Sequence, residues 1–363
     1  KPVLLYFVTG ADVIAPYFSP DEFQVLDLRE HEVNLWVAIR CLFSRDLSAQ
    51  NYALTYIKIV KPKLVITFID NFPAFFQVKN HFPNVTTVLI QNGVRVDPRD
   101  LFETKSDASS LHKNFVDKMF VFGSAIGATY AKYIQGEIAP IGSFKNNLMP
   151  ITNSKTRTVA YISTYRSGLS RHTVIPDSLP GCPIRYGEVI DRREQAIIFL
   201  ANFCQENNLG LIIIGKDEDF EGEKTYFEKL LKNYSWTIAQ RQTTTINYTV
   251  VDESEIVVFT SSTLGYESLA RGKKTAAFLI DAEIIDSPSI RFGWPVPISD
   301  EGKFWTNRLD ENRFEEILNY LLAASNNDWE KVRSETMREI INYDPGNSQF
   351  VSMVKSLRAD WYR

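Results

Sequence analysis

The chain has 363 residues, which is more than one hydrophobic core normally spans, so we expect two domains. Hydrophobic residues at 44% and charged residues at 23% are typical of soluble globular proteins and exclude a fibrous or disordered chain. The formal net charge of −4 gives no general attraction to nucleic acid or anionic lipid, although local basic patches stay open. We therefore expect no nucleic-acid partner and at most a peripheral association with membranes.

Short apolar runs without polar alternation recur along the chain, and each is followed by helical periodicity. This pattern predicts parallel strands buried on both faces between helices. In the first half the predicted strands are Val3–Val8, Gln24–Leu28, Leu64–Ile69, Thr86–Ile90, Met119–Phe122 and Ile138–Ile141. The predicted helices are Val33–Phe43, Tyr52–Val60 and Ala125–Ile134.

The pattern stops in a polar, proline-containing stretch, residues 143–157, where we place the domain boundary. Beyond it the predicted strands are Thr158–Ile162, Leu211–Ile214, Glu255–Phe259 and Thr275–Phe278. The predicted helices are Glu194–Glu206, Tyr226–Leu231, Ile246–Asp252, Leu264–Arg271, Phe314–Ala323, Trp329–Ile341 and Phe350–Trp361. The domains are thus expected at 1–145 and 156–345, and the helix in 346–363 either packs back on the first domain or mediates association.

These elements predict an α/β fold with two Rossmann-like doubly wound domains facing a cleft, followed by C-terminal helices. Ligands of such folds bind at the carboxyl ends of the strands and at the topological switch points. No run approaches the length of a membrane span and no signal-peptide pattern opens the chain. We expect a cytoplasmic protein, either free or at the inner face of the membrane.

A hydroxyl-rich turn follows the strand Glu255–Phe259 and opens the helix Leu264–Arg271. Four hydroxyl residues stand in a row there, from Thr260 to Thr263. Hydroxyls beside the free backbone N–H groups of a helix start make an anion site, because the helix dipole favours negative charge there. The alternative is that one of these hydroxyls merely caps the helix. Gly265 permits close approach of a ligand or a neighbouring strand.

Glu267 lies about one turn into the same helix, four residues beyond Thr263. Its carboxylate could accept hydrogen bonds from ribose hydroxyls, and a buried structural carboxylate is the alternative. Gly272 suits a left-handed C-cap that ends the helix before the next strand.

Residues 247–278, which contain the turn, Gly265, Glu267 and the closing Ala-Arg-Gly, resemble the donor-binding half of GT-B glycosyltransferases. The resemblance is strongest to bacterial surface-carbohydrate and capsule biosynthesis proteins. It implies that Ser261, Ser262 and Thr263 contact the donor phosphates and that Glu267 contacts the ribose. A Ser-Ser pair also binds a single phosphate in bacterial sialyltransferases and Kdo transferases of this fold, which slightly favours a CMP-sugar donor.

Two further loops are candidates for the donor side. The strand Thr158–Ile162 runs into Ser163, Thr164 and Arg166, and in the GT-B arrangement this loop faces the donor phosphate, where Arg166 could neutralise the leaving nucleotide. A surface loop with an incidental arginine is the alternative. Gly215 and Lys216 end the next strand at a position that touches base or phosphate, although Lys216 also suits a solvated ion cluster.

Catalysis needs a carboxylate on the acceptor side, as a base for inverting transfer or as a nucleophile for retaining transfer. Asp70, at the end of an apolar strand, is the first candidate, and capping of a helix is its alternative role. Asp12 follows the first strand and is the second candidate. Glu188, which with Asp191 is expected in a loop of the second domain, ranks third.

The segment from Gln91 to Arg95 resembles the Gln-His-Gly segment of surface-carbohydrate proteins, but Asn92 stands where histidine is frequent. Histidine-based catalysis is therefore not expected here. Gln91, Asn92 and Arg95 could instead hydrogen-bond an anionic sugar acceptor, and a plain Asn-Gly turn is the alternative.

Neither a metal nor a cofactor is expected. The histidines are scattered without ligand spacing, and the three cysteines are an odd number that suits reduced residues. The histidines are His31, His81, His112 and His172, and the cysteines are Cys41, Cys182 and Cys204.

The resemblance therefore implies a metal-independent glycosyltransferase that moves a sugar from a nucleotide-sugar donor to an oligosaccharide or lipid-linked glycan acceptor of a bacterial surface polysaccharide. A polyol-phosphate transferase or a nucleotide-sugar epimerase would share the same phosphate site. A non-catalytic two-lobe glycan-binding protein is the alternative from a different class.

Overall fold

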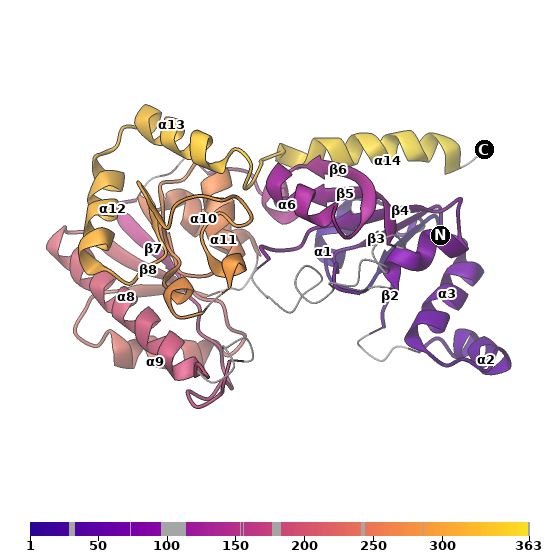
Figure 1. Cartoon of the computed structure of the whole chain (residues 1–363), viewed down its shortest axis with the longest axis horizontal. Coiled ribbons are helices and arrows are strands. Elements are labelled where there is room, and N and C mark those ends of the chain that lie inside the picture. The colour runs from indigo at the N-terminus through magenta and orange to yellow at the C-terminus, as the bar shows by residue number, and fades with distance from the viewer. Residues whose placement is uncertain are drawn as a thin grey trace. The chain divides into compact units, whose positions relative to one another are not determined.

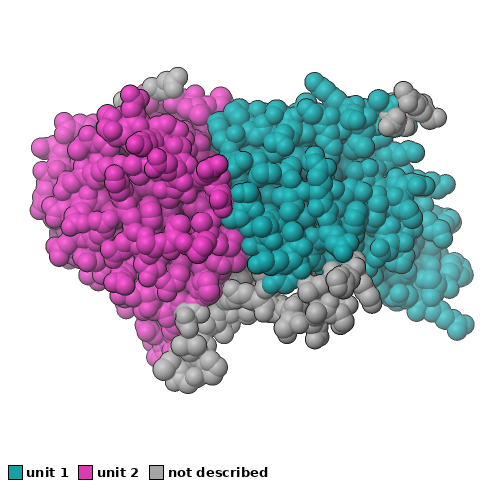
Figure 2. All heavy atoms as spheres, turned by 45° about the horizontal axis from the view of Figure 1, so that its top comes forward, with its two compact units in different colours: residues 1–93, 99–148, 342–363 teal, residues 94–98, 149–341 magenta. Residues whose placement is uncertain are grey.

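A computed structural model describes the chain except residues 29–32, 73, 96–113, 153, 155, 176–182, 241–243, 286 and 362–363, and except the side chains of 244, 245 and 360. The chain forms two compact units, which Figure 2 colours separately. Unit 1 comprises residues 1–93, 99–148 and 342–363, and unit 2 comprises residues 94–98 and 149–341. Among the described helices, none is long and apolar enough to cross a membrane.

Unit 1 is built on a six-stranded sheet in the order β2-β1-β3-β4-β5-β6, with every neighbouring pair parallel. The strands are β1 (Val3–Tyr6), β2 (Phe23–Leu26), β3 (Leu64–Thr67), β4 (Thr86–Ile90), β5 (Phe115–Val121) and β6 (Gln135–Pro140). The strands β1 and β3 are buried along their whole length, as apolar runs covered on both faces require. The direction of winding reverses between β1 and β3, which makes their carboxyl ends the switch point of this sheet.

The helices of unit 1 lie around this sheet, apart from α2, which packs on α3 (Figure 1). They are α1 (Ala11–Ile14), α2 (Leu35–Phe43), α3 (Ala49–Val60), α4 (Val78–His81), α6 (Ser124–Tyr130), α7 (Phe144–Leu148) and α14 (Ser348–Trp361). The last helix, α14, belongs to this unit because Phe350 and Val354 pack in one core cluster with Val3, Leu5 and Phe144. The helix α7 lies inside the stretch expected as a polar linker, since Phe144 is buried in this core.

Unit 2 is built on a seven-stranded sheet in the order β12-β13-β11-β10-β7-β8-β9. The strands are β7 (Thr158–Ile162), β8 (Gly210–Ile214), β9 (Thr237–Ala239), β10 (Ile256–Phe259), β11 (Thr275–Phe278), β12 (Glu301–Gly302) and β13 (Trp305–Thr306). All pairs are parallel except β12 with β13. Without the short edge strand β12, this is the Rossmann strand order, whose switch point lies between β7 and β10.

The helices of unit 2 are α8 (Tyr186–Glu206), α9 (Phe220–Leu230), α10 (Thr244–Glu253), α11 (Thr263–Ala270), α12 (Glu311–Ala323) and α13 (Asn326–Met337). The helix α12 shows how the sequence produces them. Asp310 caps its start by accepting from the N–H groups of Asn312 and Arg313, and the residues spaced i, i+3, i+4 and i+7 are buried. Those buried residues are Phe314, Ile317, Leu318 and Leu321.

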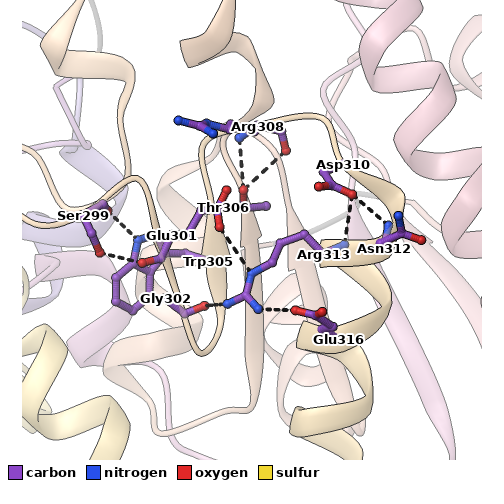
Figure 3. A network of polar contacts seen from close by, with 10 residues as sticks. All are labelled: Ser299, Glu301, Gly302, Trp305, Thr306, Arg308, Asp310, Asn312, Arg313 and Glu316. Carbon is purple, nitrogen blue, oxygen red and sulfur yellow. Dashed lines mark hydrogen bonds and ion pairs between the residues drawn. The ribbon is translucent and has the colours of Figure 1, made fainter.

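The hairpin of β12 and β13 was not predicted from the sequence, because each strand is two residues long. Figure 3 shows the side chain that ties it to α12. The Arg313 guanidinium donates to the Gly302 carbonyl at 2.6 Å and to the Glu316 carboxylate at 2.5 Å. The Trp305 indole donates to the Ser299 carbonyl at 3.0 Å, so the edge of the sheet is closed by side-chain contacts.

The helix α8 corrects one expectation. It begins at Tyr186, eight residues before the predicted start at Glu194, so Glu188 and Asp191 lie on the helix and not in a loop. Its first turns carry several charged residues, which hides the apolar periodicity of a helix.

Short 3-10 turns cover Ala15–Tyr17, Phe75–Gln77, Ile280–Glu283, Pro288–Ile290 and Pro345–Asn347.

Candidate functional site

The switch point of unit 2 brings two hydroxyl-bearing loops to one edge of the sheet. The strands β7 and β10 are parallel neighbours, with Val258 opposite Tyr161. Their carboxyl ends are therefore side by side, and the chain continues into Ser163 after β7 and into Thr260 after β10. Burial raises the pKa of Tyr161, and the neighbouring Thr260 and Thr164 hydroxyls partly offset that effect. The two loops thus meet through a buried tyrosine.

The hydroxyls at the start of α11 have three different environments, although all three residues are half-buried. Ser262 is the N-cap, and its hydroxyl accepts from the Leu264 N–H at 3.2 Å. The Thr263 hydroxyl accepts from the N–H of Val94, a residue of the same unit, at 3.1 Å. The Ser261 hydroxyl has no hydrogen-bond partner within the described part of the chain. Since Ser262 and Thr263 act only as acceptors in these bonds, all three hydroxyls keep an O–H donor for an anion beside the positive end of the helix dipole.

Gly265 is required by packing inside unit 2. A Cβ atom at this position would lie 2.2 Å from the Phe259 ring, so α11 can approach β10 only with glycine here. Of the two explanations for Gly265, close approach to a neighbouring strand is the one seen.

Glu267 faces the interior of unit 2 and is 5% exposed. Its carboxylate accepts a hydrogen bond from the Tyr248 hydroxyl at 2.8 Å. A contact of Glu267 with ribose stays a prediction, and the Tyr248 bond fixes the orientation of the carboxylate.

Sequence reasoning missed the buried ion pair of Arg271 and Asp252, which ends the same motif. Both side chains are fully buried, and the guanidinium also donates to the carbonyls of Met149 and Pro150 at 3.0 and 2.8 Å. The Asp252 carboxylate accepts in turn from the Thr152 N–H at 2.9 Å. The closing Arg-Gly therefore anchors the segment that leads into β7 and does not reach the proposed phosphate position.

Glu223 of α9 organises the loops after β7 and β8. Its carboxylate accepts from the N–H groups of Lys216, at 3.0 Å, and Asp217, at 3.1 Å, and from the Ser163 hydroxyl. The side chain is fully buried, and this burial raises its pKa. Ser163 and the Lys216 backbone are therefore held by an internal carboxylate that sequence reasoning did not identify.

Gly215 packs against the same carboxylate, since a Cβ atom there would lie 3.1 Å from a Glu223 oxygen. The Lys216 side chain is exposed. Donor binding by Gly215, Lys216 and Ser163 stays a prediction.

Thr164 and Arg166 line a cavity of about 240 Å³ on the α8 side of the β7 loop. Its walls include four tyrosines, Tyr161, Tyr165, Tyr186 and Tyr226. Arg193, which also lines it, is paired with Asp281 at 3.2 Å through Nε. Two of the predicted donor residues thus share a concave, aromatic-lined space.

The switch point of unit 1 holds the two predicted acceptor-side carboxylates. Asp70 follows β3, is 8% exposed, and accepts a hydrogen bond from the buried Tyr130 hydroxyl. Asp12 follows β1, in the first turn of α1, and is exposed. The Thr67 hydroxyl donates to the Tyr6 carbonyl at 3.2 Å and joins the two strands just before these loops begin. The sheet order therefore places Asp70 and Asp12 at the same edge.

In the segment after β4, Gln91 has a structural role. Gln91 is buried, accepts from the Phe122 N–H at 2.8 Å and donates to the Gly93 carbonyl at 2.9 Å, so it joins the ends of β4 and β5. Asn92 is exposed and Arg95 is half-buried. Their contact with an acceptor stays a prediction.

Glu188 has a capping role. Its carboxylate accepts from the Arg185 N–H at 2.9 Å in a capping box at the start of α8. This contact gives Glu188 a structural role, and its catalytic role stays a prediction.

Cys41 and Cys204 are buried free thiols, and burial raises the pKa of Cys204 to about 12. Cys182, His31 and His112 lie outside the described residues. Within the described ranges, no group of three or more His, Cys, Asp or Glu side chains is placed to hold a metal ion.

A protein-family model described as "putative O-antigen biosynthesis protein" matches residues 88–358 of the chain. This match confirms the resemblance to surface-carbohydrate biosynthesis proteins. A search of curated proteins found no match.

Solved structures show similarity over nearly the whole chain. UDP-GlcNAc 2-epimerase from Neisseria meningitidis, bound to UDP-GlcNAc, has a TM-score of 0.50 at 12% identity, with 99% of each chain covered. UDP-GlcNAc 2-epimerase from Methanocaldococcus jannaschii has a TM-score of 0.52 at 10% identity, with 98% of each chain covered. The wall teichoic acid polymerase TagF has a TM-score of 0.53 at 9% identity, with 100% of this chain and 90% of that chain covered. At these identities the similarity shows the fold alone, which is the GT-B class with two Rossmann-like units.

Proposed function

The chain belongs to the family described as "putative O-antigen biosynthesis protein", and on that premise we propose that it is a glycosyltransferase of surface-polysaccharide synthesis with a nucleotide-sugar donor. The observation that carries the proposal is the start of α11 at the switch point of unit 2. There the Ser261 hydroxyl has no partner among the described residues, while Ser262 already caps the helix. A helix start with a spare hydroxyl suits a phosphate group.

The donor is proposed to be a CMP-sugar in the first instance. The support is the adjacent pair Ser261 and Ser262 at one helix start, since such a pair binds a single phosphate in the sialyltransferases and Kdo transferases that the motif resembles. Arg166, in the loop that follows β7, would supply positive charge as the nucleotide leaves.

The transfer step needs a base for the acceptor. As the bond from the anomeric carbon to the phosphate oxygen breaks, the acceptor oxygen bonds to that carbon and loses its proton. We propose Asp70 of unit 1 as the group that takes this proton, with its carboxylate oriented by Tyr130. Asp12, which is exposed, is the second candidate.

An epimerase is the second candidate function, because epimerases share this fold over 98–99% of both chains. The two functions differ in their products. The full chain is incubated with CMP-, UDP-, GDP- and CDP-linked sugars, with and without an oligosaccharide acceptor, and the products are identified by mass spectrometry.

A glycosyltransferase releases nucleotide and extends the acceptor, and its turnover depends on that acceptor. An epimerase changes the sugar without any acceptor. Tight binding of free glycan with no turnover of any activated donor would contradict both enzyme functions and favour a non-catalytic glycan-binding protein.

A further inference from the structure

The helix α2 has a second apolar face that is exposed. Val37 and Cys41, spaced i and i+4, are buried and face inward. On the opposite side of the helix, exposed apolar residues follow the spacing i, i+1, i+7 and i+8. They are Leu35, Trp36, Leu42 and Phe43, with exposed fractions of 72%, 58%, 59% and 85%. We call this set the α2 outer face.

The described residues of unit 1 leave the α2 outer face exposed. The inner side of α2 packs on α3, where the Tyr52 hydroxyl accepts from the Asn34 N–H at 2.8 Å, and Asn51 donates to the Ser44 hydroxyl at 3.0 Å. In Figure 1, α2 lies on the far side of α3 from the sheet. Val33 and Leu47 flank the helix and are also exposed, at 65% and 66%. A contiguous exposed apolar surface of this kind marks an interaction site.

The segment that contains α2 and α3 is positively charged although the chain as a whole is negative, and two of its cations, Arg40 and Arg45, lie on α2 and just after its end. Residues 33–63 contain five cations and one acid, a net charge of +4 in a chain whose formal net charge is −4. The cations are Arg40, Arg45, Lys58, Lys61 and Lys63, and all five are exposed. The Arg40 guanidinium lies over the Trp36 ring at 5.1 Å, so cation and aromatic ring are adjacent on the same surface.

We propose that the α2 outer face binds the surface of an anionic lipid bilayer. Trp, Phe and Leu on one face of a helix enter the boundary between headgroups and acyl chains, while neighbouring Lys and Arg are attracted to anionic headgroups.

A second copy of this chain fits the charges less well. In a two-fold dimer the α2 outer face would meet itself, and the cations Arg40 and Arg45 would face the same cations. This inference goes beyond the proposed transfer reaction and can be tested without it.

The test is co-sedimentation of the full chain with vesicles. We expect the chain to sediment with vesicles that contain phosphatidylglycerol and far less with vesicles of phosphatidylcholine alone. The variant Trp36→Gln Phe43→Gln is expected to lose about tenfold or more of its vesicle affinity. The variant Arg40→Gln Arg45→Gln is expected to lose roughly 30-fold, about fivefold for each cation.

Val174→Gln, which replaces an exposed apolar residue of unit 2, is the matched control and should bind vesicles like the wild type. Because all the substituted side chains are exposed, the melting temperature of each variant should match that of the wild type. A loss of vesicle binding then cannot be attributed to unfolding. Sedimentation velocity on the same proteins measures whether each one is a monomer or a dimer.

Wild-type chain that stays in the supernatant with phosphatidylglycerol vesicles would overturn the proposal. A second result would also overturn it: a wild-type chain that binds no vesicles but forms a dimer, which dissociates in the Trp36→Gln Phe43→Gln variant. The α2 outer face would then bind a second copy of the chain. Equal vesicle binding by Val174→Gln, the wild type and both α2 variants would also overturn it.

Discussion

The Tyr248 hydroxyl donates to the Glu267 carboxylate at 2.8 Å, and both side chains are buried. Tyr248→Phe therefore leaves the carboxylate with one donor fewer and should lower the free energy of unfolding by about 1–3 kcal/mol. Urea denaturation measures the change. If Glu267 also contacts ribose, as we predict, Glu267→Gln should weaken nucleotide binding more than Tyr248→Phe does. Equal nucleotide affinities in both variants would leave Glu267 with a structural role alone.

Removal of Arg271 should be far more costly than removal of a surface charge. Arg271→Leu leaves Asp252 as an uncompensated buried charge and should lower the free energy of unfolding by about 3–5 kcal/mol. Glu228→Gln, which breaks the exposed pair of Glu228 with Lys224, is the matched control and should cost about 0–1 kcal/mol. Both are measured by urea denaturation. Similar values for the two variants would show that the Arg271 pair does not anchor the segment before β7.

Glu223 should make stability depend on pH in one direction. Burial raises the pKa of Glu223 in the folded state, so the folded protein binds this proton more tightly than the unfolded chain does. The resulting stabilisation is complete below the ordinary pKa of about 4.3, and it is lost as the pH rises through the folded-state pKa. The free energy of unfolding of the wild type, relative to Glu223→Gln, should therefore fall as pH rises above about 4. Denaturation of both proteins across this range measures it. A difference that stays constant with pH would contradict the assignment.

Asp70→Asn should lower turnover by roughly 10²–10⁴-fold, the usual contribution of a general base, while leaving the dissociation constant of the nucleotide unchanged. Tyr130→Phe removes the hydrogen bond that orients Asp70 and should reduce turnover by less. Asp117→Asn is the control, since Asp117 is held by Lys79 and by the Thr87 N–H within the same sheet. Wild-type turnover in Asp70→Asn would remove this residue from the mechanism and favour Asp12.

The strands were predictable because buried parallel strands are short apolar runs. The predicted Thr86–Ile90, Thr158–Ile162 and Thr275–Phe278 agree with β4, β7 and β11 to the residue. The strands β9, β12 and β13 were missed because two or three residues carry no periodicity. The early start of α8 was missed because charged residues fill its first turns.

The environment of the site could not be predicted, because it depends on contacts distant in the chain. Glu223 lies 60 residues from Ser163, and Asp252 lies 19 residues from Arg271 on a different helix. No local sequence pattern distinguishes a carboxylate that accepts hydrogen bonds from loop N–H groups from a carboxylate that binds a ligand. The hydroxyl turn was visible in the sequence, but only the structure shows that Ser262 caps α11 while Ser261 has no partner in the described part of the chain.

The central claim is that a nucleotide phosphate binds at the start of α11. The most direct measurement is calorimetric titration of CMP into the wild type, into Ser261→Ala Ser262→Ala, and into Ser325→Ala. Ser325 caps α13 as Ser262 caps α11, so both variants lose a cap worth about 1 kcal/mol of stability. We predict that the double variant binds CMP at least about tenfold more weakly, since a hydrogen bond to a charged group contributes about 1.5–3 kcal/mol, and that Ser325→Ala binds like the wild type. Equal CMP affinity in all three proteins would contradict the claim.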